Sequence, residues 1–418
     1  MWTYPWRYKE GFAIGGGLIV TGLLLQFCTG GIVWEAFAFP VNLIALFVFL
    51  SIALCIYIGR RKSAVCRFLS TTASAIPAMT YAATLTVIMG LTPQIINGTI
   101  PFLSSLGITQ MLRFQPFVLI YIWVALTVSQ ICLQRLHHFK FRNIPSLLCH
   151  GGLLVVLLAA TLGYPDIRKL KMTITKDRPE WRAIDDKERV TELPLAIQLK
   201  NFTIEEYPPK LILVNINTGQ AVPSGKPETL LLDSMELNGR HSQFSGLMGK
   251  WNVVVLKFIE NAAPEMRSDT TNYVEWPFTG AENAALVEVS GTSKAKIRDW
   301  ITGGSYLFPP QSIPVDDSTS LVLPAREPRR YTSDIEVMTK RGKHIETVVE
   351  VNKPFHIEGW NIYQLSYNEN MGRWSDTSTL ELVSDPWLPA VYIGIFMILA
   401  GTVCMFILTK CRKEEKQQ

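Results

Sequence analysis

The longest polar stretch of the chain, residues 164–385, contains no cysteine. The seven cysteines all lie elsewhere, at Cys28, Cys55, Cys66, Cys132, Cys149, Cys404 and Cys411. No two of them are spaced as CxxC, and the sequence has no CxxCH. The polar stretch therefore has no disulfide and no thiol-exchange centre. The chain also does not itself carry c-type haem.

Catalytic and nucleotide-binding motifs are missing as well. No glycine-rich loop is followed by a Walker lysine, and Ser245 does not lie in a G-x-S-x-G nucleophile elbow. The histidines of the polar stretch, His241, His344 and His356, are scattered and have no cysteine companions at zinc spacing. We therefore predict no catalytic residue and no zinc site in this stretch.

Charged residues make up only 18% of the chain, whereas hydrophobic residues make up 48%. This balance favours a membrane protein that carries a soluble domain. The net charge of +5 comes from basic residues gathered in short runs beside apolar segments, which is typical of membrane topology. We therefore expect the lipid bilayer to be a partner and expect no nucleic acid.

Six apolar runs are long enough to cross a bilayer as helices. They cover residues 11–27, 40–58, 73–91, 116–132, 145–163 and 389–408. The segments between them are basic on one side only, because the two short loops on the other side hold no cation except Arg113. The positive-inside rule then places both termini in the cytoplasm and residues 164–385 outside it.

The polar stretch predicts a mainly-β domain. Its short β-branched or aromatic runs are bounded by Gly, Pro, Asn or Asp and cover residues 193–199, 210–216, 251–258, 285–289, 334–338, 346–351 and 360–365. Residues 293–301 are the one helical candidate. We expect a β-sandwich or an irregular barrel. The predicted domains are five membrane helices in residues 1–163, a β-rich extracytoplasmic domain in 164–388, and a last helix with a basic cytoplasmic tail in 389–418.

One histidine, His150, lies inside the fifth apolar run, near its basic end. An ionisable side chain inside a membrane is costly without a partner, so it marks a functional site by default. A neutral imidazole is also a good ligand for a metal or for haem iron. The alternative is that His150 bonds a carbonyl of a neighbouring helix and serves packing alone.

Aromatic residues crowd the end of the polar stretch. They are Phe355, Trp360, Tyr363, Tyr367, Trp374 and Trp387. Some of them are expected in the β core. The others, from Trp360 onward, are candidates for a flat apolar surface that contacts a partner or a porphyrin.

Several segments resemble the ResB (CcsB) family of cytochrome c biogenesis proteins. Four of them lie late in the chain: Arg330-Tyr-Thr-Ser-Asp-Ile-Glu-Val-Met, Glu350-Val-Asn-Lys-Pro, Gly359-Trp-Asn-Ile-Tyr-Gln-Leu-Ser-Tyr and Asp385-Pro-Trp-Leu-Pro-Ala-Val-Tyr-Ile-Gly. Earlier, His150-Gly151-Gly152-Leu153 is similar to the family's H-x-G-L helix opening, and residues 199–207 are similar to an early strand of its outer domain.

The resemblance implies a membrane subunit of the System II cytochrome c maturation machinery in the bacterial inner membrane, with its large domain in the periplasm. Such a subunit acts with a CcsA-type partner to carry haem across the membrane and to promote its covalent attachment to apocytochrome c. The resemblance also gives His150 the role of a ligand to haem b, held transiently and shared with the partner. The chain is then a non-redox subunit of a haem lyase complex, without catalytic residues and without a metal other than haem iron.

The chain lacks the tryptophan-rich W-G-x-x-W-x-W-D segment of the CcsA side. The resemblance therefore excludes the fused form and implies that the outer haem ligands belong to the partner. The four spans before the His150 helix exceed the usual ResB arrangement, and their role is open. Two alternatives stay beside haem delivery: a haem-free membrane scaffold or apocytochrome chaperone, and a transporter of another solute, which the few polar residues in the spans disfavour.

Overall fold

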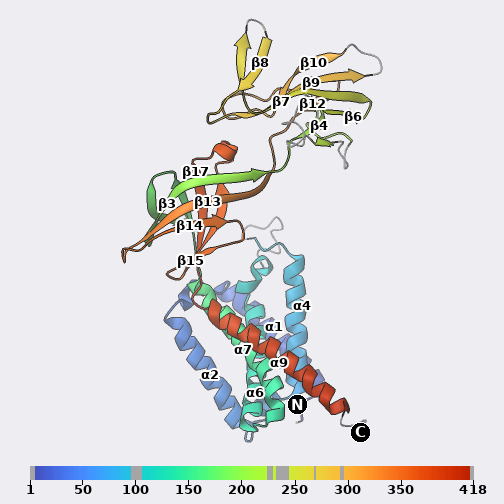
Figure 1. Cartoon of the computed structure of the whole chain (residues 1–418). Coiled ribbons are helices and arrows are strands. Elements are labelled where there is room, and N and C mark those ends of the chain that lie inside the picture. The colour runs from blue at the N-terminus through green and yellow to red at the C-terminus, as the bar shows by residue number, and fades with distance from the viewer. Residues whose placement is uncertain are drawn as a thin grey trace. The chain divides into compact units, whose positions relative to one another are not determined.

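The computed structural model describes residues 5–95, 106–223, 229–231, 244–267, 270–291 and 296–414. The chain folds into two units (Figure 1). Unit 1 consists of residues 1–167 and 385–418, and unit 2 consists of residues 168–384. Unit 2 is therefore inserted into the sequence of unit 1, ahead of its last helix.

Unit 1 is helical in its described residues. Its helices are α1 (Tyr8–Thr29), α2 (Val41–Gly59), α3 (Ala64–Phe68), α4 (Thr72–Leu91), α6 (Gln115–His137), α7 (Ile144–Gly163) and α9 (Leu388–Glu414). All of these except the short α3 are long and apolar enough to cross a membrane. The six predicted spans are thus confirmed as apolar helices of membrane-crossing length.

Helices α7 and α9 pack closely and run in opposite directions. The contact pairs Gly152 with Gly394, and a Cβ added at Gly152 would lie 2.5 Å from the Gly394 carbonyl oxygen. Further along, a Cβ at Gly401 would lie 2.7 Å from Cys149 Sγ. Glycines at these positions let two helix backbones approach each other, which strengthens packing where lipid supplies no hydrophobic driving force.

Unit 2 is built from antiparallel strands. They are β1 (Arg168–Thr175), β2 (Pro179–Asp185), β3 (Val190–Glu206), β4 (Lys210–Asn215), β5 (Thr229–Leu231), β6 (Phe244–Met248), β7 (Trp251–Arg267), β8 (Thr270–Glu275), β9 (Glu282–Gly291), β10 (Ile297–Thr302), β11 (Ile313–Pro314), β12 (Thr319–Val322), β13 (Pro328–Thr339), β14 (His344–Glu350), β15 (Phe355–Ile357), β16 (Trp360–Tyr367) and β17 (Thr377–Ser384). They form three sheets, ordered β14-β13-β3-β2-β1-β17-β16-β15, β10-β9-β7-β6 with β8 beside β7, and β11-β12-β4-β5.

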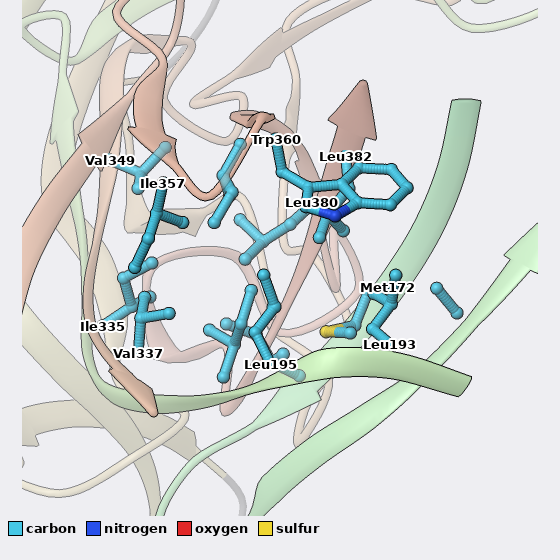
Figure 2. Close-up of a cluster of buried hydrophobic side chains, with 14 of the residues drawn as sticks. Met172, Leu193, Leu195, Ile335, Val337, Val349, Ile357, Trp360, Leu380 and Leu382 are labelled. Atoms are coloured by element: carbon cyan, nitrogen blue, oxygen red, sulfur yellow. The ribbon is translucent and has the colours of Figure 1, made fainter. Parts of the chain in front are cut away.

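The eight-stranded sheet encloses its own core. Its inward residues alternate along β1, β3, β13 and β17, and they include Met172, Leu195, Val337 and Leu380 (Figure 2). Every member of this cluster comes from the same sheet, so the sheet curls around its side chains. The hydroxyl of Tyr331 on β13 donates to the Leu365 carbonyl on β16, across the curl. We call this sheet with its connections the first lobe.

The two smaller sheets form the second lobe. Leu211 and Leu321 from one sheet share a buried cluster with Val255 and Val287 from the other, which makes a small β-sandwich. The second lobe lies between β3 and β13 in the sequence, and these two strands pair over most of their length. The mainly-β character that the sequence pattern predicted is confirmed. Of the two alternatives, a β-sandwich or an irregular barrel, the second lobe forms a small sandwich, whereas the first lobe is a curled sheet.

Each β run that the sequence pattern predicted lies within or overlaps a strand, whereas the helix predicted at residues 293–301 is wrong from residue 296 onward; residues 293–295 lie outside the described residues. Residues 297–302 form β10, which pairs with β9 from Ile297 opposite Val289 to Thr302 opposite Ala284. The side chains of Trp300 and Ile301 are buried in this arrangement. Pairing with a neighbouring strand and burial of these side chains outweigh the local helical preference.

The glycine contact between α7 and α9 gives a test of unit 1. Gly152→Ala should lower the free energy of unfolding by about 1–3 kcal/mol, because the new Cβ meets the backbone of α9 and overpacks the contact. Gly151→Ala is the matched control, since its Cβ would meet only Met397 Cε at 3.5 Å. Thermal unfolding of the detergent-solubilised protein measures both. Equal effects of the two variants would contradict the assigned contact.

Candidate functional site

His150 lies on α7, six residues after the helix begins at Ile144. At a rise of 1.5 Å per residue this places its backbone roughly 9 Å along the helix. Pro145 occupies the first turn, where a missing N–H costs nothing, and no acidic or basic residue lies in the first or last turn of the helix. The imidazole is half-buried.

The His150 ring has a defined tautomer. Its Nδ1 lies 2.7 Å from the carbonyl oxygen of Ser146, one helical turn earlier, and 3.4 Å from the Ser146 hydroxyl. A carbonyl oxygen can only accept, so Nδ1 carries the proton and donates it. The lone pair of the neutral ring is then on Nε2. Histidines that bind metals are commonly oriented by this kind of hydrogen bond on the other ring nitrogen.

The face of α7 that carries His150 turns toward α6. Residues 150, 154, 157 and 161 share one face of a helix. At the far end of that face, Thr161 Oγ1 donates to the Tyr121 hydroxyl of α6 at 2.9 Å, and that hydroxyl donates to the Leu157 carbonyl. Gly152 lies on the side that contacts α9. α7 therefore uses separate faces for its two neighbours.

A buried polar network in α6 was not anticipated from the sequence. Gln130 is fully buried, and its amide donates to the Ala53 carbonyl of α2 at 2.9 Å. Gln134, one turn later, donates to the carbonyl of Ser70. Buried amides of this kind fix the contact between helices when their hydrogen bonds are made. The only sequence signal was two glutamines at the end of an apolar run.

An imidazole pair lies at the end of α6. The rings of His137 and His138 are 4.8 Å apart, and His137 contacts the ring of Tyr57 on α2. The guanidinium of Arg60 lies 4.0 Å from the same tyrosine ring. The contact of the His137 ring with the Tyr57 ring joins the end of α6 to the end of α2. Arg60, which follows α2, lies over the face of the same tyrosine and is held there electrostatically.

Asp166 joins three segments of unit 1. Its carboxylate accepts the backbone N–H of Phe39 at 2.8 Å, the side-chain amide of Asn42 at 2.7 Å and the indole N–H of Trp387 at 2.8 Å. The Trp387 side chain also covers Gly163, where a Cβ would come within 2.5 Å of it. Asp166 therefore connects the start of α2 with the end of α7 and the start of α9.

The aromatic residues proposed as a partner or haem surface are not gathered on one surface of unit 2. Trp360 is buried in the core of the curled sheet, and Tyr367 packs against that core beside Phe202 and Tyr331, each ring 5.1 Å away. Tyr363 lies on β16 between the buried positions of that strand, so it points to the opposite face from Trp360. Within unit 2, two of these rings thus belong to the core and one to the outer face.

The remaining two aromatic residues make specific hydrogen bonds. The indole of Trp374 donates to the Ala281 carbonyl at 2.8 Å, which joins the first lobe to the second. Trp387 belongs to unit 1 and donates to Asp166. The structure therefore gives Trp374 and Trp387 contacts that the crowding of aromatic residues did not indicate.

The histidines of unit 2 lie apart on exposed strands. His344 Nδ1 lies 3.2 Å from a Glu336 carboxylate oxygen, and His356 Nδ1 lies 3.0 Å from the Asn361 amide oxygen. His241 lies outside the described residues. Across the described ranges, no group of three or more His, Cys, Asp or Glu side chains is arranged to hold a metal ion.

A family model for the ResB-like family matches residues 244–376. This segment is ResB-like. The match confirms the predicted resemblance and includes three of the quoted segments, those that begin at Arg330, Glu350 and Gly359. It covers under half of the chain and ends before Asp385, and His150 lies outside it. The ResB-like match implies a general role in cytochrome c biogenesis. No curated protein matches the chain.

The Asp166 contacts predict a graded effect on the stability of unit 1. Asp166→Ala leaves three N–H donors without their acceptor and should lower the free energy of unfolding by about 1–3 kcal/mol. Trp387→Phe removes only one of these hydrogen bonds and keeps an aromatic ring near Gly163, so its effect should be smaller. Thermal unfolding in detergent compares the two. An unchanged Asp166→Ala variant would show that the carboxylate contributes nothing.

Proposed function

We propose that the chain is a membrane subunit of the System II cytochrome c maturation machinery. It acts with a CcsA-type partner to carry haem b across the bacterial inner membrane and to promote its attachment to apocytochrome c. The ResB-like segment supports the general role. The observation that carries the haem-binding part is the His150 tautomer, because it leaves an iron-binding nitrogen free on an apolar helix.

Haem is the cargo in this proposal, and His150 would bind its iron through Nε2. The Ser146 carbonyl holds the ring by Nδ1–H, which fixes its orientation. A second ligand to the iron would come from the partner. The half-buried position gives the ring access to a ligand while keeping most of it out of water.

The charge pattern supports an orientation with both termini in the cytoplasm and unit 2 in the periplasm. His150 then lies in the inner half of the membrane, where haem made in the cytoplasm would enter. The His137, His138 and Arg60 cluster belongs to the same cytoplasmic side. Its positive charge is suited to the carboxylates of an entering porphyrin.

Unit 2 would then position the apocytochrome. Thioether bonds form when two cysteine thiols add across the haem vinyl groups, which requires reduced thiols and close placement. Unit 2 contains no cysteine, so it contributes placement and not reduction. The ResB-like segment contains strands of both lobes, and we assign this placement to their outer surface.

Haem spectroscopy tests the ligand. The chain co-purified with a tryptophan-rich CcsA-type partner should show a haem absorbance band that falls several-fold in His150→Ala. Free imidazole should restore part of the band by occupying the space that the side chain leaves. His344→Ala is the matched control, because this exposed histidine lies on β14 of unit 2 and has no part in the proposed haem path. Unchanged haem content in His150→Ala, with unchanged cytochrome c yield, would instead support the haem-free scaffold.

Accessibility labelling tests the orientation. A cysteine introduced at Lys340, in the exposed turn between β13 and β14, should react with an impermeant maleimide in intact cells. A cysteine introduced at Lys62, after α2, should react only after the membrane is permeabilised. Unit 2 has no native cysteine, so labelling within it reports the introduced residue alone. The opposite pattern would contradict the proposed orientation.

A further inference from the structure

The second lobe is attached to the first by two short connections. Residues 207–209 lead from β3 into β4, and residues 323–327 lead from β12 back into β13. At this point the Tyr207 N–H donates to the Glu327 carbonyl, and Lys210 pairs with the Glu327 carboxylate at 2.6 Å. We call these two connections the neck. Two chain connections alone restrain the angle between the lobes only weakly. Other contacts must therefore hold the two lobes together.

A brace from the first lobe provides such contacts. The short 3-10 helix η5 (Gly372–Trp374) lies between β16 and β17 and reaches the second lobe. The Arg373 guanidinium donates to the carbonyls of Glu260 and Ala281 at 3.2 and 3.1 Å, and the Trp374 indole donates to the same Ala281 carbonyl. The brace therefore hydrogen-bonds to the backbone of β7, at Glu260, and to the backbone of Ala281 just before β9.

Charged side chains meet behind the brace. Arg326 of the neck lies 3.7 Å from a Glu206 oxygen at the end of β3 and 3.2 Å from a Glu260 oxygen on β7. Arg326 and Glu206 are largely buried, with 10% and 14% of their side chains exposed, whereas Glu260 is half exposed. The Arg326 contacts thus bridge a strand of the first lobe and a strand of the second.

The acids outnumber the bases in this group. Two carboxylates share the Arg326 guanidinium, because its Nη1 lies 3.7 Å from a Glu206 oxygen and 3.2 Å from a Glu260 oxygen. The charges of Arg373 and Arg326 lower the pKa of Glu206, whereas those of Glu282 and Glu260 raise it. Tyr367 on β16 also lies within electrostatic reach of Glu206. Glu260 and Glu282 belong to the second lobe, and Glu206 belongs to the first.

The hydrogen bonds of the group are incomplete among the described residues. Arg326 Nε and Nη2 and Arg373 Nε are buried without a hydrogen-bond partner. Glu206 has only the 3.7 Å contact with Arg326, which is longer than a hydrogen bond. Buried charged donors without partners are costly in free energy, so the surrounding fold must hold this group of charges together. A change in the charge of one member can therefore shift the contact between the lobes.

We propose that Glu206, Glu260, Glu282, Arg326 and Arg373 form a proton-sensitive latch that holds the second lobe of unit 2 against the first. When Glu206 is ionised, it repels the two carboxylates of the second lobe, and the lobes separate at the brace while the neck stays connected. When Glu206 takes up a proton, this repulsion disappears and the two arginines balance the two remaining acids. Acidification therefore closes the latch.

The sign follows from proton linkage. Burial and the nearby Glu282 and Glu260 carboxylates raise the pKa of Glu206, against the opposing effect of Arg373 and Arg326. A group whose pKa is raised in the closed state binds its proton more tightly there, so the closed state gains stability as the pH falls. This gain in stability of the closed state is complete below the ordinary glutamate pKa. It is lost as the pH rises through the raised pKa that Glu206 has in the closed state. In the opened state the carboxylate is hydrated and its pKa returns toward the ordinary range.

Hydrogen exchange on the full-length protein in nanodiscs tests the latch. The readout is exchange of the backbone amides of residues 276–282 and 371–375, which include hydrogen-bonded amides on both sides of the brace. At pD 7.5, Glu206→Gln should exchange more slowly than wild type in both segments. At pD 4.0, below the ordinary glutamate pKa, the two proteins should be alike. Because the two proteins are compared at the same pD, the intrinsic exchange rates of the amides cancel. One titrating proton changes the equilibrium between the open and closed states by at most tenfold per pH unit.

Two further variants complete the experiment. Glu205→Gln is the matched control, because Glu205 is the exposed neighbour of Glu206, and it should follow wild type at both pD values. Arg373→Gln removes the guanidinium hydrogen bonds to the Glu260 and Ala281 carbonyls. It should therefore accelerate exchange at both pD values. Unchanged protection of residues 193–199 in the first-lobe core shows that each variant is folded. Equal exchange of Glu206→Gln and wild type at pD 7.5, or an equal effect of Glu205→Gln, would overturn the latch.

Discussion

Antiparallel pairing between the first and last strands of unit 2 is the constraint on which its placement in the chain depends. β1 and β17 pair without interruption from Arg168 opposite Ser384 to Thr175 opposite Thr377. A long insertion whose ends are paired adds little strain to the fold that receives it, since its entry and exit points lie side by side. The helices that precede and follow the insertion, α7 and α9, can then remain neighbours, and Gly152 and Gly394 let them do so closely.

The same arrangement is repeated inside unit 2. The second lobe is inserted between β3 and β13, and these strands pair from Pro328 opposite Glu206 to Thr339 opposite Leu195. After each insertion, the chain thus re-enters the same sheet or helix pair from which the insertion began. Within unit 2, polar contacts of Arg326 and Arg373 join the two lobes.

The packing of α7 also defines what His150 can do. One face of this helix is committed to α9 through glycines, and the face that carries His150 contacts α6 further along through Thr161 and Tyr121. The imidazole satisfies one nitrogen within its own helix, at the Ser146 carbonyl, and so it needs no partner helix to be stable. Nε2 then remains as the ring nitrogen that the proposed ligand role of His150 would use.

The sequence by itself determined six apolar helices, a mainly-β insertion before the last of them, and His150 as a candidate ligand, because hydrophobic length and strand alternation are local properties. It misassigned residues 297–301, since β10 is decided by pairing with β9. Only the tertiary structure decided that Trp360 belongs to a core, that Asp166 joins three segments, and that Glu206 and Glu260 both contact Arg326. These contacts join residues far apart in the chain, and their energy depends on distance and burial, which no local pattern records.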